Sequence, residues 1–109
     1  MNKEYLLKEL SDKAIEEIYY EHMTYDFPES ELKPLKLLLD CKKVDLYKCF
    51  GLFDGDKLLA YSYFANDPDK KIILLDYLAV VKNMRNAGYG SIMLSKIREY
   101  FRENSTVEK

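Results

Sequence analysis

Apolar positions along the chain change their spacing near residue 45, from a helical period to the runs and alternations of strands. The first helical pattern is expected to start after Ser11, a favourable N-cap, and to end before Phe27-Pro28, because the residue preceding a proline disfavours helical geometry. Residues 4–10 are expected to form a short strand ahead of it. Residues at helical spacing follow Ser11: Ala14, Ile15, Ile18, Tyr19 and His22.

A second helical pattern follows an aromatic segment, 23–29, that is expected to be an ordered loop. Ser30 can cap this helix, and Pro34 would then lie late in the first turn, where its missing N–H costs little. The apolar stripe of the helix consists of Leu32, Leu35, Leu38 and Leu39. The sequence therefore predicts two helices before the first long strand.

Two β-rich runs, 45–53 and 57–66, flank Asp54-Gly55-Asp56, and Asp-Gly is a strong signal for the tight turn of an antiparallel hairpin. A third run, 71–81, follows a second turn at 66–69. The second and third runs are apolar on both faces, which requires helices on both sides of the sheet. We therefore expect an α/β (α+β) fold, with a mixed, mostly antiparallel sheet flanked by helices on both faces.

The last helical pattern opens near Gly88 and runs to Phe101, followed by a polar tail over 104–109. The apolar face of this helix consists of Tyr89, Ile92, Met93, Ile97, Tyr100 and Phe101. No internal repeat or domain boundary interrupts the pattern, and 109 residues suit a single domain, residues 1–109.

Composition and charge exclude several classes of function. Apolar residues make up 48% and charged residues 33%, the balance of an ordinary globular protein, and a formal net charge of -2 argues against broad binding of nucleic acid. No apolar stretch is long enough to span a membrane and the N-terminus is too polar for a signal peptide, so a cytoplasmic location is expected. Cys41 and Cys49 lack the spacing of a zinc site, and we expect reduced thiols and no metal.

The candidate chemistry lies in the hexapeptide Arg85-Asn86-Ala87-Gly88-Tyr89-Gly90, between the last apolar run and the last helix. A strand, a short basic loop with glycines and a helix can together turn several backbone N–H groups toward one anion. A tight turn alone would explain the glycines, but not the arginine three residues before the first of them. The sequence therefore predicts a phosphate-binding loop.

Two common phosphate loops do not fit this hexapeptide. A Walker A loop needs Lys-Ser or Lys-Thr after its second glycine, whereas Gly90 is followed by Ser91-Ile92. A dinucleotide-binding fingerprint needs a third glycine where this chain has Met93. The phosphate is therefore not expected to belong to a hydrolysed nucleotide or to NAD.

The strand and the loop together read Leu78-Ala79-Val80, four further residues, and then Arg-x-x-Gly-x-Gly. This pattern resembles the acetyl-CoA-binding motif of the GNAT-type N-acetyltransferases, and the order of elements resembles that family over essentially the whole chain. The resemblance implies acetyl transfer from acetyl-CoA to an amine, carried by a small molecule or a peptide. Two other interpretations stay open: a CoA-binding or protein-interaction module without efficient catalysis, and an unrelated phosphate-binding domain.

The resemblance also implies which residues contact the cofactor. The backbone of Leu78, Ala79 and Val80 would pair with the pantetheine arm, and the N–H near Val80 could polarise the thioester carbonyl. Arg85 would add positive charge at the entry to the loop. The backbone N–H groups expected to take the pyrophosphate are those of Asn86, Ala87, Gly88, Tyr89, Gly90 and Ser91.

Asp76 is a carboxylate in an otherwise apolar strand, which is costly unless the group is solvated or paired. In families of this kind, an acid on this strand can act as general base toward the incoming ammonium. Alternatively, Asp76 orients the acceptor or caps a neighbouring loop, and the sequence favours neither role. Aromatic residues expected to wall the acceptor, beside Asp26, are Tyr25, Phe27, Tyr61 and Tyr63.

The family pattern normally continues beyond the loop helix with another strand, a helix and a final hairpin, and a tyrosine there often serves as general acid. Residues 105–107 could begin that strand, and no residue of this chain can be assigned the acid role. We therefore expect an incomplete domain whose third β-rich run, 71–81, has a free edge. An exposed apolar edge favours pairing with another chain, so a homodimer through this edge is expected.

Overall fold

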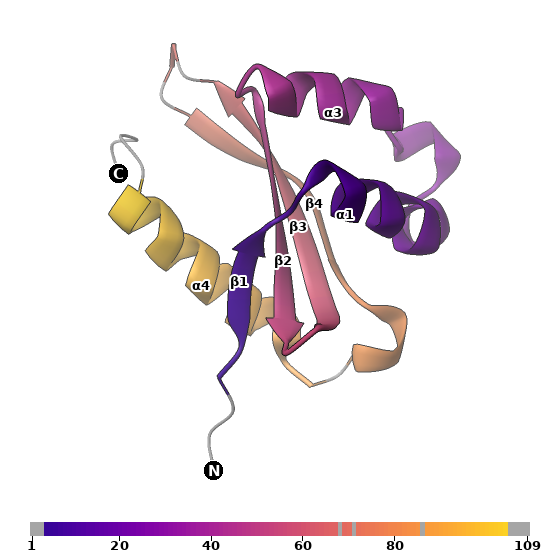
Figure 1. Cartoon of the computed structure of the whole chain (residues 1–109), viewed down its shortest axis with the longest axis vertical. Helices are drawn as coiled ribbons and strands as arrows, with labels where there is room; N and C mark the ends of the chain where they lie inside the picture. The colour runs from indigo at the N-terminus through magenta and orange to yellow at the C-terminus, as the bar shows by residue number, and fades with distance from the viewer. Residues whose placement is uncertain (1–3, 68, 71, 86, 105–109) are drawn as a thin grey trace.

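The computed structural model describes residues 4–67, 69–70, 72–85 and 87–104. Its centre is a four-stranded sheet in the order β1-β2-β3-β4, drawn in Figure 1. The strands are β1 (Leu6–Glu9), β2 (Tyr47–Asp54), β3 (Lys57–Asp67) and β4 (Ile72–Val80). All three pairings are antiparallel, so the mostly antiparallel sheet is confirmed, and the described residues contribute no parallel pair.

Helices cover both faces of this sheet, as the sequence predicts. Helices α1 (Asp12–Ile18) and α3 (Leu35–Lys43) lie on one face, and α4 (Tyr89–Asn104) lies on the other (Figure 1). The first face has a core of mixed aliphatic and aromatic side chains, including Ile15, Ile18, Leu38, Cys49, Tyr61, Tyr63 and Tyr77. The core beneath α4 includes Phe50, Leu52, Leu59, Phe64, Met93 and Ile97.

The first helical region keeps the boundaries that the sequence predicts. Ser11 caps α1, its hydroxyl oxygen accepting a hydrogen bond from the Ala14 N–H at 3.2 Å. The helix then widens into a π-helical turn, η1 (Tyr19–Met23), and closes with α2 (Thr24–Asp26). The first part of the expected loop, 23–29, is therefore helical. Phe27, which precedes a proline, is extended and ends the region.

The second helix starts later than the sequence pattern predicts. Residues Glu29–Glu31 form a single 3-10 turn, η2, and α3 begins only at Leu35, with Pro34 in extended geometry just outside it. The expected cap at Ser30 is therefore wrong. Lys33 precedes a proline and is disfavoured in helical geometry, and its N–H is held instead by the Tyr77 hydroxyl oxygen at 2.9 Å.

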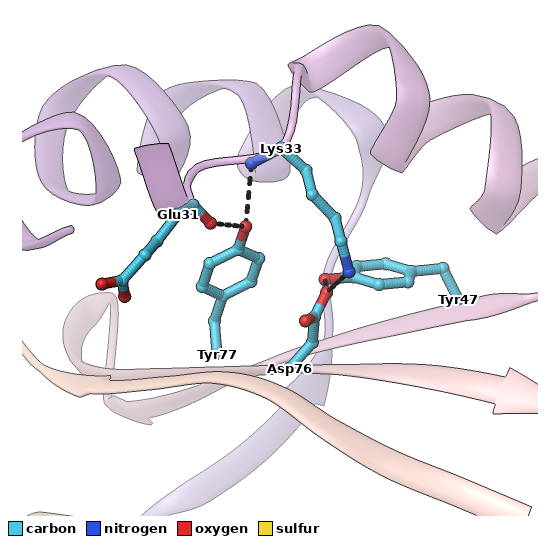
Figure 2. Close-up of polar contacts among 5 residues, drawn as sticks. All are labelled: Glu31, Lys33, Tyr47, Asp76 and Tyr77. Carbon is cyan, nitrogen blue, oxygen red and sulfur yellow. Dashed lines mark hydrogen bonds and ion pairs between the residues drawn. The ribbon is translucent and has the colours of Figure 1, made fainter. Parts of the chain in front are cut away.

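A bulge in β4 sets the direction of two functional candidates. Tyr63 of β3 pairs with Tyr77, but its neighbour Phe64 pairs with Leu75, so Asp76 is an extra residue in β4. Asp76 and Tyr77 consequently both point toward the side of the sheet that carries α3, as Figure 2 shows. Simple alternation along the strand would have put them on opposite faces.

The first half of β4 departs from the expectation that helices cover both faces. β4 is an edge strand of the described sheet, and Leu74 and Leu75 are 61% and 51% exposed. By contrast, residues 59–64 of β3 are buried on both faces. β3 is apolar on both faces because both faces are buried, as expected. The first half of β4 is also apolar on both faces, but there the leucines are in contact with solvent.

Candidate functional site

The carboxyl end of β4 leaves backbone groups facing an open edge. The Val81 N–H donates to the Leu59 carbonyl oxygen of the neighbouring strand at 2.9 Å. Because backbone groups alternate in direction along an antiparallel strand, the N–H and carbonyl of Val80 point away from β3. The Val80 carbonyl oxygen accepts instead from the Arg85 Nε at 3.3 Å. This end of β4 can therefore pair with an extended ligand.

The segment after β4 brings the start of α4 beside this edge. A short 3-10 turn, η3 (Lys82–Met84), leads into the loop, and Gly88 has a φ of 77°, a conformation that favours glycine. The Gly88 carbonyl oxygen accepts from the Ile92 N–H at 3.2 Å as α4 begins. The first N–H groups of a helix have no intrahelical acceptor, so those of the first turn are available to an anion. Asn86 lies outside the described residues.

Gly90 is the second glycine of the loop motif, and the fold itself does not require it. A Cβ built there would meet the Val80 Cγ2 atom at 3.6 Å, an ordinary van der Waals contact. Its φ is not in the left-handed region, unlike that of Gly88. An alanine would therefore fit in the unliganded chain, which leaves close approach of a ligand to the backbone as the physical reason for a glycine.

Arg85 turns inward to a carboxylate from the first helical region. Its terminal guanidinium nitrogen lies 3.2 Å from Asp26 Oδ1, and Asp26 Oδ2 accepts from the Tyr61 hydroxyl at 2.7 Å. The Asp26 side chain is only 9% exposed. Burial and the neighbouring Asp26 carboxylate raise the pKa of Tyr61 far above its ordinary value, so this phenol keeps its proton and donates.

These groups surround a pocket of about 370 Å³ at the end of β4. Its lining residues are Asp26, Phe27, Leu78, Ala79, Val80 and Arg85. The structure thus brings together Phe27, the three strand residues and Arg85, which the sequence pattern singles out separately. Tyr61 joins them through its hydrogen bond to Asp26, whereas Tyr25 does not line the pocket and is 83% exposed.

Asp76 does not line this pocket. Its contacts lie in a cluster of polar side chains, which Figure 2 draws. Its Oδ2 accepts from the Lys33 ammonium at 2.5 Å and from the Tyr47 hydroxyl at 2.6 Å. Burial, followed by the Asp76 carboxylate, raises the pKa of Tyr47 far above its ordinary value. Sequence reasoning missed Lys33 and Tyr47. They lie 43 and 29 positions from Asp76, so no local spacing marks their contacts with it.

Tyr77 links this cluster to the pocket. Its hydroxyl donates to the Glu31 carbonyl oxygen at 2.8 Å while accepting from the Lys33 N–H, as Figure 2 shows. Its ring packs edge-on against that of Phe27, with centroids 5.0 Å apart. The segment between the helical regions is therefore fixed over β4 by the side chains of Asp76 and Tyr77.

Comparison with known protein families shows to which family a chain with these features belongs. The sequence model of the acetyltransferase (GNAT) family matches residues 12–109, which include the β4 end, the loop and α4. The chain belongs to the GNAT acetyltransferase family. A search of curated protein sequences gives no significant match.

Solved structures of GNAT acetyltransferases share the fold at low sequence identity. The ribosomal-protein-S18-alanine N-acetyltransferase of Escherichia coli is 17% identical, with a TM-score of 0.68 over 92% of this chain. The spermidine N-acetyltransferase of Vibrio cholerae is 12% identical, with a TM-score of 0.70 over 93%. This GNAT chain spans 61% and 64% of the lengths of those two chains.

A third similar structure is an aminoglycoside acetyltransferase from an uncultured soil metagenomic sample, crystallised in complex with sisomicin. It is 11% identical, with a TM-score of 0.64, over 93% of this chain and 72% of its own. At these identities the likeness concerns the fold. Among the described residues, no helix is long and apolar enough to cross a membrane, and no cluster of acidic, cysteine and histidine side chains has the composition of a metal site.

Proposed function

We propose that this GNAT chain binds acetyl-CoA and transfers the acetyl group to an amine. The observation that carries the proposal is the junction of β4 and α4, where backbone at the edge of the described sheet, held only by the Arg85 side chain, faces a helix N-terminus across Gly90. The similar enzymes of E. coli and V. cholerae are described as acting on the alanine of a ribosomal protein and on spermidine, both amines. An amine acceptor is the chemistry that these proteins have in common.

The cofactor would lie along the open edge of β4. The peptide groups of Leu78 and Val80 are directed to pair with the amides of the pantetheine arm. The backbone N–H groups of residues 87–91 would take the pyrophosphate, and Asn86 is proposed with them. Arg85 would leave Asp26 and turn to the phosphates when the cofactor binds. The Leu78 N–H, which faces the same edge farther from the phosphates than Val80, is then the proposed donor to the thioester carbonyl oxygen.

In the proposed reaction, the neutral amine nitrogen attacks the thioester carbonyl carbon. The bond from carbon to sulfur breaks, CoA leaves as the thiolate, and the amine proton is lost to a base. Asp76 already accepts hydrogen bonds from two donors, Lys33 and Tyr47. These contacts support a role in holding the 29–34 segment, which corresponds to the loop-capping alternative, rather than a role as general base. We therefore propose no proton transfer through Asp76.

A titration of the chain with acetyl-CoA, followed by calorimetry, tests the proposal. Gly90→Ala should weaken binding by about tenfold, or about 1.4 kcal/mol, because the new methyl group blocks close approach to the backbone. Ser95→Ala, at an exposed position later in α4, is the matched control and should leave the affinity unchanged. Absence of binding by the unmodified chain would contradict the proposal.

An assay of thiol release from acetyl-CoA with a panel of primary amines then tests catalysis. Amine-dependent release that Gly90→Ala slows would support acetyl transfer. Tight binding of acetyl-CoA without any amine-dependent release would instead support the second function, a CoA-binding module.

We also propose that two copies associate through β4. The exposed Leu74 and Leu75 lie on the edge of the described sheet, where backbone groups are unpaired. Beside them is an apolar groove of about 420 Å³ between β4 and α4, lined in part by Ile73, Leu75 and Leu94. Pairing of the first halves of two β4 strands would cover Leu74 and Leu75 and leave the edge at Leu78 and Val80 open to the cofactor.

A further inference from the structure

We propose that Tyr5, the residue before β1, is a positioning residue of the proposed phosphate site. Its ring holds Tyr89, the first residue of α4, and so fixes the helix turn whose N–H groups would take the pyrophosphate. The inference rests on the proposed function, because it concerns the same loop. It is carried by an edge-on contact in which the ring centroids of Tyr5 and Tyr89 lie 5.5 Å apart.

Tyr89 needs an anchor because of its neighbours in the loop. Gly88 and Gly90 flank it, and Gly88 has a φ of 77°. Glycine gives the backbone many conformations, so a stretch with two glycines loses more freedom when a ligand orders it. Neither glycine has a side chain, so the packing of Tyr89 decides how well the turn is held. A turn that is already fixed binds a ligand at lower cost.

Tyr5 can serve as this anchor because the sheet holds it. β1 follows Tyr5 directly and pairs with β2, so that Leu6 lies opposite Phe53. The rings of Tyr5 and Tyr89 both pack on the core beneath α4, and Figure 1 shows β1 beside this helix. Edge-to-face aromatic pairs are favourable beyond the area that they bury. The ring of Tyr5 thus connects a paired strand to the start of α4.

A second contact joins β1 to α4 far from the loop. The Tyr100 hydroxyl donates to Glu9 Oε1 at 3.1 Å, and the Tyr100 ring packs against Phe50 with centroids 5.0 Å apart. Tyr100 lies about three turns after Tyr89, so its loss should weaken the packing of the helix without loosening the first turn. The two tyrosines therefore separate general stability from positioning of the loop.

The proposed support lies outside the part of the chain that the family model matches. That match covers residues 12–109, which include the phosphate loop but not Tyr5. The pantetheine arm is proposed to pair with β4, which is aligned by β3. Loss of the Tyr5 ring should therefore weaken binding of the phosphates alone, raising the KM for acetyl-CoA and leaving kcat unchanged.

Calorimetric titration with acetyl-CoA and with inorganic pyrophosphate tests the proposal. Tyr5→Leu removes the ring and should weaken binding of acetyl-CoA and of pyrophosphate about fivefold, whereas Tyr5→Phe keeps the ring and should retain both affinities. Tyr100→Leu is the matched control, which should lower Tm at least as much as Tyr5→Leu and leave both affinities unchanged. Unchanged acetyl-CoA affinity in Tyr5→Leu, or an equal loss in Tyr100→Leu, would overturn the proposal.

A double variant shows whether Tyr5 acts through Tyr89. Tyr89→Leu breaks the same ring contact from the side of the helix. Tyr5→Leu/Tyr89→Leu should therefore bind acetyl-CoA no more weakly than Tyr89→Leu alone. Additive losses would show that Tyr5 acts by another route and would contradict the assigned role.

Hydrogen exchange of the free chain, measured by NMR, needs no ligand. The Ile92 N–H donates to the Gly88 carbonyl oxygen at 3.2 Å as α4 begins, and a helix end opens locally rather than with the whole fold. This N–H should exchange about fivefold faster in Tyr5→Leu and unchanged in Tyr100→Leu. Unchanged exchange in Tyr5→Leu would refute the role of Tyr5 alone. Faster exchange, with no binding of acetyl-CoA by the unmodified chain, would refute the proposed function alone.

Discussion

The Lys33 ammonium nitrogen lies 2.5 Å from Oδ2 of Asp76, the extra residue of the β4 bulge. The contact joins the segment before α3 to the edge strand of the described sheet. Tyr47 donates to the same oxygen, so the Asp76 carboxylate has two donors from two different elements. A carboxylate held in this way is suited to fixing the position of a segment over the strand.

We expect Asp76→Asn to reduce stability while keeping the pH dependence of thiol release. The amide can still accept from Tyr47 but loses the charge that pairs with Lys33, so the free energy of unfolding should fall by about 1–2 kcal/mol. Urea denaturation measures the stability, and rates across a pH series measure the profile. A variant that folds normally yet loses the pH dependence would instead identify Asp76 as the general base.

Two buried tyrosines should respond oppositely to removal of their hydroxyl groups. Tyr77→Phe leaves the Glu31 carbonyl and the Lys33 N–H without their shared partner and should lower the free energy of unfolding by about 1–2 kcal/mol. The buried Tyr63 hydroxyl has no hydrogen-bond partner in the described part of the chain, so Tyr63→Phe should be neutral or stabilising. Thermal unfolding of both variants checks this; equal destabilisation would contradict the assigned contacts.

Stability should fall as the pH rises above about 10, the ordinary pKa of tyrosine. Burial raises the pKa of Tyr47, Tyr61 and Tyr63 in the folded chain, so these phenols keep protons that the unfolded chain has already released. Their contribution is fully present below the unfolded pKa and is lost as the pH rises through the folded values. Urea denaturation at a series of alkaline pH values measures the slope, which Tyr63→Phe should reduce.

Association through β4 should be sensitive to charge on that strand. Leu75→Lys puts an ammonium at the exposed edge and should convert a dimer to a monomer in sedimentation equilibrium. Leu6→Lys, at an exposed position on the opposite edge strand, β1, is the matched control and should leave the dimer intact. A monomeric unmodified chain at high concentration would rule out the proposed dimer.

The sequence alone was sufficient for features that depend on local chemistry. Asp54-Gly55 predicts the hairpin because few residues adopt the positive φ that Gly55 has here, and Ser11 predicts the start of α1 because its side chain caps the neighbouring N–H groups. The late start of α3 has one local cause, Pro34, which disfavours helical geometry at Lys33, and one distant cause, because the Lys33 N–H is held by Tyr77, 44 positions later. No local period carries information about such a contact.

Sequence patterns likewise reveal the contiguous part of the candidate site but not its long-range contacts. The loop from Arg85 to Gly90 is recognisable in the sequence because its residues are contiguous. Its expected chemistry comes from its own backbone N–H groups and from the positive charge of Arg85. The sequence also places Asp26 among the acceptor residues, but its ion pair with Arg85, 59 positions away, has no local signal, because Asp26 is one of many acidic residues. The β4 bulge was equally hidden, because an extra residue in a strand leaves the apolar run continuous.

The π-helical turn at Tyr19–Met23 has a geometric consequence for the pocket at the end of β4. An α-helix advances by about 100° per residue, so the additional residue in a widened turn rotates every later side chain about the helix axis by that amount. Asp26 is the third residue after this turn, while Ile15 and Ile18 precede it and lie in the core. Insertion or deletion of a single residue here would therefore redirect Asp26 and Phe27, both of which line the pocket, and leave Ile15 and Ile18 in place.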